Sequence, residues 1–222
     1  MKFSLFDLLF NPNRFFQDTL GDTEHLKMPV LIVLAGAILS AGYGYLAGSL
    51  TAKLMDSAMG GLGAVMTIFV IFAAFAGVFI FWLVWAGLFY LISKLFKGEG
   101  SFNRCLEVVG YGYLPQVFGA AITLIAALEY LPKVVVPQLT SSALQDPTVI
   151  TEATKALMQD PAMMAYTQTA AVISVVFLLW SANTWIFGLK QVRKLSMRDA
   201  AICVGAPVLV FIIYVIATMA GA

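Results

Sequence analysis

The longest stretch without a charged residue runs from Asp56 to Lys94, and it is the feature that most restricts how this chain can fold. It is apolar, and it exceeds the roughly 20 residues that a helix needs to cross a bilayer core of about 30 Å. Within lipid, a backbone satisfies its hydrogen bonds only as a helix or in a closed barrel. Barrel strands alternate apolar and polar residues, and this stretch does not. We therefore expect the chain to cross a membrane as helices.

The composition extends this expectation to the whole chain. Of the 222 residues, 61% are hydrophobic and 11% are charged, whereas soluble domains carry about 25% charged residues. So few charges cannot cover a soluble surface. The pattern predicts an all-α membrane protein, a bundle of five transmembrane helices that forms one domain over residues 1–222. The expected spans are residues 29–52, 64–93, 106–129, 165–187 and 199–220.

Residues 1–27 carry two short apolar pieces that Pro12 separates, and neither is long enough to cross a bilayer. The first piece places large apolar side chains at helical spacing, at Phe3, Phe6, Leu9 and Phe10. Two interpretations stay open: an amphipathic segment in the plane of the membrane interface, or a cap packed on the ends of the spans. A cleaved signal peptide is not expected, because the region before the first span is long and holds several acidic residues.

The connection over residues 130–164 is the external loop in this arrangement. Asp146 followed by Pro147 is a favourable helix start, and the Asp160–Pro161 pair is expected to end that helix. The sequence therefore predicts a short external helix on the outer face of the bundle.

Small residues recur every four positions along the first span, and such a stripe lets another helix approach closely. Its members are Gly36, Ser40, Gly44 and Gly48. The partner can be a helix of the same bundle or a second copy of the chain. We expect an internal partner, because a bundle of several spans needs such a face in any case.

The turn after the second span leads into a helix start that carries Arg104 and Glu107. Their i, i+3 spacing predicts an ion pair on one helix face at the membrane boundary. The alternative is that Glu107 meets a partner or a substrate there.

Pro115 lacks an amide hydrogen and is expected to kink the third span. Gly110 permits a close helix approach just before the kink, and Tyr111 and Tyr113 are expected to hydrogen-bond the backbone groups that the kink frees. In the fourth span, Asn183 is expected to hydrogen-bond between helices. The candidate functional or packing residues are thus Arg104, Glu107, Gly110, Tyr111, Tyr113, Pro115 and Asn183.

Three short motifs resemble those of the Yip1-domain family of multi-span membrane proteins. They are Gly98-x-Gly100-Ser101-Phe102, Gly110-Tyr111-x-x-x-Pro115, and the N-terminal group Pro12, Phe15, Phe16 and Leu20. The resemblance implies a membrane scaffold or adaptor, because eukaryotic members are Golgi and ER proteins that associate with prenylated small GTPases in vesicle traffic. Those members carry a longer polar N-terminal region. This chain is more similar to the short, prokaryotic branch.

The basic residues are distributed unequally between the two sides that five spans would create. Lys53, Lys133 and Lys155 fall on one side, and ten fall on the other: Lys2, Arg14, Lys27, Lys94, Lys97, Arg104, Lys190, Arg193, Lys194 and Arg198. The positive-inside rule then predicts a cytoplasmic N-terminus. Splitting the second span into two crossings would weaken this bias.

The sequence shows no catalytic constellation, since the only histidine is His25 and no paired carboxylates fall within a span. We expect no enzymatic activity, no cofactor and no metal. The net charge of +1 offers no footprint for nucleic acid. The expected partners are the lipid bilayer and a second copy or another membrane protein, in a cell membrane or, in a eukaryote, an ER or Golgi membrane. The alternative function is a transporter or channel component for an apolar or lipid-like substrate, bound beside the kinked helices.

Overall fold

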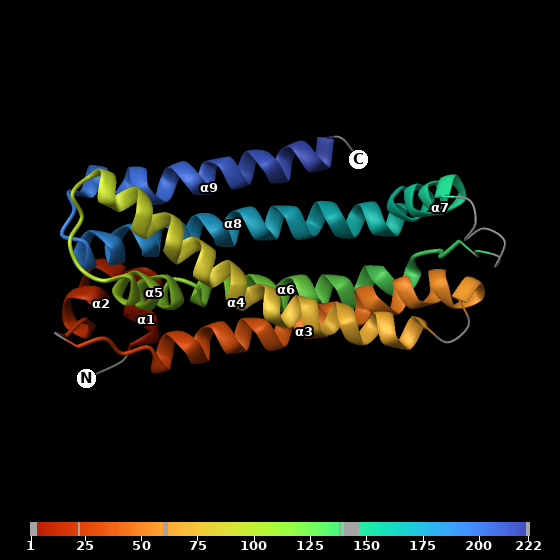
Figure 1. Cartoon of the computed structure of the whole chain (residues 1–222), viewed down its shortest axis with the longest axis horizontal. Helices are drawn as coiled ribbons and strands as arrows, with labels where there is room; N and C mark the ends of the chain where they lie inside the picture. The colour runs from red at the N-terminus through yellow and green to blue at the C-terminus, as the bar shows by residue number, and fades with distance from the viewer. Residues whose placement is uncertain (1–3, 22, 60–61, 138, 140–146, 221–222) are drawn as a thin grey trace.

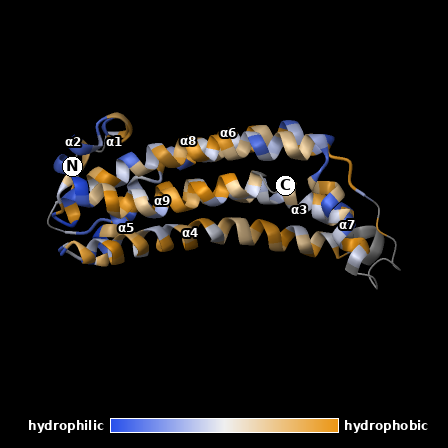
Figure 2. Cartoon of the chain, turned by 90° about the horizontal axis from the view of Figure 1, so that it is seen from above, coloured by the Kyte–Doolittle hydropathy of each residue, from blue (hydrophilic) through white to orange (hydrophobic). Residues whose placement is uncertain are grey.

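Five long helices lie side by side and give the molecule its long axis (Figure 1). The computed structural model describes residues 4–21, 23–59, 62–137, 139 and 147–220. Within these residues the regular structure is helical throughout. Figure 2 shows hydrophilic residues gathered near the two ends of the bundle and hydrophobic residues along its length, as expected of helices surrounded by lipid.

The five long helices are α3, α4, α6, α8 and α9, and shorter helices cover the two ends of the bundle. The long helices are α3 (Lys27–Met59), α4 (Gly63–Leu95), α6 (Leu114–Tyr130), α8 (Pro161–Val192) and α9 (Met197–Ala220). The shorter ones are α1 (Leu5–Phe10), α2 (Pro12–Thr19), α5 (Phe102–Tyr111), the 3₁₀ turn η1 (Leu131–Lys133) and α7 (Pro147–Met158). In Figure 1, α1, α2 and α5 lie together at one end, and α7 lies at the other.

Five segments are long and apolar enough to cross a membrane, which confirms the predicted fold class. They are Lys27–Leu54, Gly63–Leu95, Leu114–Lys133, Pro161–Val192 and Met197–Met219. The helix α4 has 33 residues and is about 50 Å long at 1.5 Å per residue. It therefore exceeds the hydrocarbon thickness, and it crosses the other helices obliquely in Figure 1. The cytoplasmic placement of the N-terminus stays a prediction.

The third crossing differs from the expected kinked helix over residues 106–129. The chain forms two helices instead, because α5 ends at Tyr111 and α6 begins at Leu114. Pro115 lies in the first turn of α6, where its missing amide hydrogen removes no helical hydrogen bond. The crossing therefore starts at Leu114, and α5 belongs to the end of the bundle.

The predicted short helix is present as α7, and Asp146 lies outside the described residues. Asp160 does more than follow this helix, because its side chain caps α8 by accepting hydrogen bonds from the amides of Ala162 (2.8 Å) and Met163 (3.2 Å). It also accepts one from Val135 (3.1 Å) after η1. The fourth long helix consequently begins at Pro161, four residues before the expected start of the span.

The stripe of small residues on α3 faces other helices of the same chain. A Cβ atom at Gly44 would lie 3.0 Å from the Cα of Ile71, and one at Gly48 would lie 2.9 Å from the Cα of Thr67. Gly36 faces Val117 of α6 and Val78 of α4 at longer distances. The close approach of α3 and α4 therefore depends most on Gly44 and Gly48.

Replacing Gly48 by leucine should force these two backbones apart. Overpacking of this kind costs about 1–3 kcal/mol, so we expect a lower midpoint of thermal unfolding in detergent. Gly77 on α4 is the matched control, because nothing lies within 4 Å of a Cβ atom placed there. Equal loss of stability in Gly48→Leu and Gly77→Leu would show that the α3–α4 contact is not sensitive to volume at the stripe.

Candidate functional site

Most of the candidate functional or packing residues lie on α5 or at the start of α6. The helix α5 lies with α1 and α2 at one end of the bundle, here called the polar end (Figure 1). The helix α2 buries Phe15 and Phe16 there, as a cap would. The helix α1 buries Leu8 but leaves Phe6 and Phe10 exposed by 69% and 62%, as an interfacial helix would. The burial of α2 fits the cap, and the exposed face of α1 fits the interfacial segment, whose place in the membrane stays a prediction.

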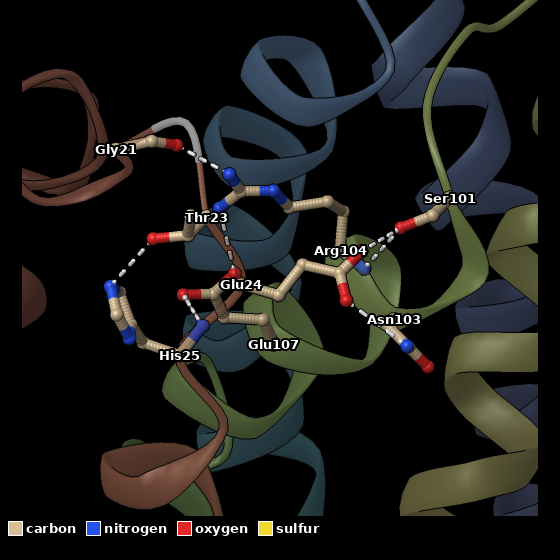
Figure 3. A network of polar contacts seen from close by, with 8 residues as sticks. All are labelled: Gly21, Thr23, Glu24, His25, Ser101, Asn103, Arg104 and Glu107. Atoms are coloured by element: carbon tan, nitrogen blue, oxygen red, sulfur yellow. Dashed lines mark hydrogen bonds and ion pairs between the residues drawn. The ribbon is translucent and has the colours of Figure 1, made fainter.

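A carboxylate from the segment between α2 and α3 ties that segment to the start of α5 (Figure 3). Glu24 accepts hydrogen bonds from the Ser101 hydroxyl and from Nδ2 of Asn103 (3.0 Å). Ser101 is also the N-cap of α5, where its Oγ accepts from the amide of Arg104 (3.2 Å). The pKa of Glu24 is lowered, chiefly by the hydrogen bond from Ser101 and to a smaller extent by that from Asn103.

The predicted ion pair is present, with 2.9 Å between Nη1 of Arg104 and Oε2 of Glu107. Glu107 is fully buried, and its other oxygen accepts from the backbone amide of His25 (3.3 Å). Arg104 also donates to the carbonyl of Gly21. Both oxygens of Glu107 are therefore engaged within the chain (Figure 3). Burial raises the pKa of Glu107, and the Arg104 guanidinium opposes that rise.

The break between α5 and α6 leaves a carbonyl that a tryptophan of α8 satisfies. The amide of Tyr113 donates to the carbonyl of Gly110 (3.3 Å), whereas in a regular α-helix it would donate to that of Val109. The Nε1–H of Trp185 donates to the carbonyl of Val109 (3.0 Å). A Cβ atom on Gly112 would lie 2.2 Å from Cδ1 of Trp185. The indole therefore fills this place only because residue 112 is glycine.

The aromatic residues of α5 and α2 pack together. The ring of Tyr111 is buried, and its centroid lies 5.2 Å from that of Phe15 and 6.3 Å from that of Phe16. Gly110 lets Pro29 approach, since a Cβ atom there would lie 2.6 Å from Cβ of Pro29. The N-terminal motif and the Gly-Tyr motif are thus two sides of one contact.

Arg193 is the principal residue of the polar end that sequence reasoning missed. It is 1% exposed. Its Nε donates to Oγ of Ser93 (2.9 Å), Nη2 to the carbonyl of Gly98 (2.7 Å), and Nη1 to the carbonyl of Gly100. The guanidinium also lies 4.6 Å from the ring centroid of Tyr90. Its partners lie about a hundred residues earlier in the chain, so local spacing could not reveal them. Only its position near the end of the fourth apolar run hinted at a role.

The glycines of the turn allow this contact. Gly100 has φ +88°, which a residue with a side chain rarely adopts, and a Cβ atom there would lie 2.7 Å from the carbonyl oxygen of Val192. The amide of Glu99 donates to the carbonyl of Arg193 (3.1 Å), and its carboxylate lies 2.6 Å from Nζ of Lys194. The Gly-x-Gly motif therefore lets the backbone of this turn pack closely on the end of α8.

Asn183 does not join these residues, because it is exposed on α8. Within the described part of the chain Asn183 makes no hydrogen bond to another helix, so the prediction of such a bond is wrong. Of the remaining candidates, Arg104 and Glu107 are paired, Gly110 and Tyr111 are buried against α2 and α3, and Tyr113 and Pro115 begin α6. This arrangement can hold a rigid surface in place.

Replacing Arg193 by alanine should destabilise the protein strongly. Three acceptors would lose a charged donor, and hydrogen bonds to charged groups contribute about 1.5–3 kcal/mol each. We expect a large fall in the thermal midpoint in detergent. Arg198→Ala is the matched control, since Arg198 is exposed in the same basic region. Arg193→Lys should rescue little, because an ammonium group lacks the planar fork. Wild-type stability in Arg193→Ala would contradict the structural role.

Glu107 should make stability depend on pH. Because the pKa of Glu107 is raised in the folded state, its contribution to the free energy of unfolding is fully present at pH values below its ordinary pKa of 4.5. That contribution is lost as the pH rises through the raised pKa. Glu107→Gln removes this titration. The wild-type midpoint should therefore fall relative to that of the variant as pH rises toward neutrality. Glu152→Gln, at an exposed position of α7, is the matched control for the substitution itself. A wild-type midpoint that rises relative to Glu107→Gln would mean that Arg104 outweighs burial.

Comparison with known proteins agrees with the motifs. The model of the Yip1 domain matches residues 6–219. The chain is also 39% identical, over 121 residues, to an uncharacterized protein of the archaeon Methanocaldococcus jannaschii, a match that covers 54% of this chain and 86% of that protein. No solved structure matches the chain. With five helices able to cross a membrane, the chain belongs to the Yip1-domain family and is a multi-pass membrane protein.

Proposed function

We propose that the protein is a non-enzymatic membrane scaffold or adaptor of the Yip1 type, resident in a cell membrane. The observation that carries this proposal is the polar end, where short helices and turns from four parts of the chain are fixed to one another. Hydrogen bonds join the segment after α2 to α5, and the turn before α5 to α8. A surface held in this way keeps its shape, and a preorganised surface loses less entropy when a partner binds.

The outer face of α2 is the part of this surface most suited to a protein partner. Arg14, Gln17 and Asp18 are exposed there, and Arg14 and Asp18 form an ion pair at 3.5 Å. The opposite face of α2 is buried by Phe15 and Phe16. The partner proposed for this face is a protein, either a second copy of the chain or another membrane protein. The association of eukaryotic family members with small GTPases supports a protein as the kind of partner.

Site-specific photo-crosslinking in native membranes tests this proposal. A photoreactive residue at Gln17 should give protein adducts of discrete mass, identified by mass spectrometry. The control position is Phe72, which is 68% exposed on α4 and should react with lipid. Adding Arg14→Glu should lower the yield of the protein adducts. Lipid adducts alone at Gln17, or a yield indifferent to Arg14→Glu, would count against a partner at this face.

A second candidate function is a transporter or channel component for an apolar or lipid-like substrate. It is favoured by a cavity of about 220 Å³ beside Tyr113, lined also by Trp85, Trp185 and Gln116. This cavity lies beside the start of α6, next to the break between α5 and α6. Its lining carries no ionised residue, so the substrate class that suits it is uncharged.

A further inference from the structure

A group of polar side chains inside the membrane-crossing region surrounds a cavity of about 430 Å³ between α3, α6 and α8. Hydroxyl and amide groups supply its polarity, and no charged residue lines it. Its polar lining includes Ser40, Tyr43, Gln116, Thr123, Tyr166 and Ser174. A cavity of this size and composition is suited to a small polar group.

Some of these polar groups lack partners. Ser40, Gln116 and Thr123 are half-buried, and their side chains make no hydrogen bond within the described part of the chain. Unsatisfied donors and acceptors in a membrane interior are costly. A ligand bearing hydroxyl groups would satisfy those that line the cavity.

A second cavity shares lining residues with this polar one, and an apolar groove shares lining residues with the second cavity. Gln116 and Ser174 also line the 220 Å³ cavity beside Tyr113. That cavity shares Phe81, Trp85 and Phe211 with a groove of about 610 Å³ between α4 and α9. The groove is lined by apolar and aromatic residues. The groove is therefore apolar, whereas the 220 Å³ and 430 Å³ cavities both carry polar side chains.

We propose that these cavities bind a neutral lipid whose head bears hydroxyl groups, of the monoacylglycerol type. The head occupies the 430 Å³ cavity between α3, α6 and α8, and the acyl chain lies in the groove between α4 and α9. An ionised head is disfavoured, because none of the three linings offers a countercharge and a charge desolvated without one is costly. This inference deepens the second candidate function, because it uses the same cavity beside Tyr113. It is independent of the scaffold role, which rests on the outer face of α2.

Tryptophan quenching in proteoliposomes tests the proposal on the full chain. Trp85 and Trp185 line the middle cavity, so a monoacylglycerol with a brominated chain should quench their fluorescence in a saturable way. Brominated phosphatidylcholine and brominated phosphatidic acid, at the same mole fractions, report ordinary contact with bulk lipid and with a charged head. Quenching by the monoacylglycerol should saturate at a lower mole fraction than either.

Two pairs of variants locate the head and the chain. Gln116→Leu should weaken binding about tenfold, the scale of one lost buried hydrogen bond or a little more, whereas Gln168→Leu, at an exposed position outside the three cavities, should not. Ala206→Phe should fill the groove and abolish saturable quenching, whereas Ala73→Phe on the exposed face of α4 should not.

Because Ala206 and Ala73 are both exposed, neither of the latter variants disturbs the core. Equal quenching by all three lipids, or unchanged binding in both Gln116→Leu and Ala206→Phe, would overturn the proposal. A preference for phosphatidic acid would also overturn it. Crosslinking at Gln17 reads out the scaffold role separately, so the two proposals can fail independently.

Discussion

The need to satisfy backbone carbonyls where helices end inside a membrane protein governs the polar end of this structure. Two irregular places occur there, the turn before α5 and the break after it. Neither is satisfied by its own segment alone. Arg193 donates to the carbonyls of Gly98 and Gly100, and Trp185 donates to that of Val109. Both donors belong to α8, so the irregular backbone is stable only while α8 is in place.

The helix α8 also holds the N-terminal residues. The Nε1–H of Trp180 donates to the carbonyl of Leu9 (2.9 Å), and Phe16 packs against Gly188, where a Cβ atom would lie 2.9 Å from its ring. The last turns of α8 thus contact α1, α2, α5 and the turn before α5. The same helix also carries Ser174 and Leu178, which line the cavity beside Tyr113.

Sequence reasoning predicted the features that depend on local spacing. Apolar runs predicted five crossings, and the i, i+3 spacing predicted the pair of Arg104 and Glu107. It could not predict partners separated by long stretches of chain, which is why Arg193 and Trp185 were not singled out. Asn183 was misjudged because α8 is apolar over most of its circumference, so the sequence does not show which face is covered. The exact end of α5 was also missed, since a proline permits either a kink or a new helix start.

The role of Arg193 also bears on orientation. It is one of the ten basic residues whose excess on one side predicts a cytoplasmic N-terminus. In the folded chain its three guanidinium nitrogens are engaged and it is removed from water, so its presence there has a structural reason independent of topology. Without it the bias is nine against three, which still favours the same orientation. The contact of Arg193 with Gly98 and Gly100 therefore accounts for one of the ten basic residues on that side. The other nine support the predicted cytoplasmic N-terminus.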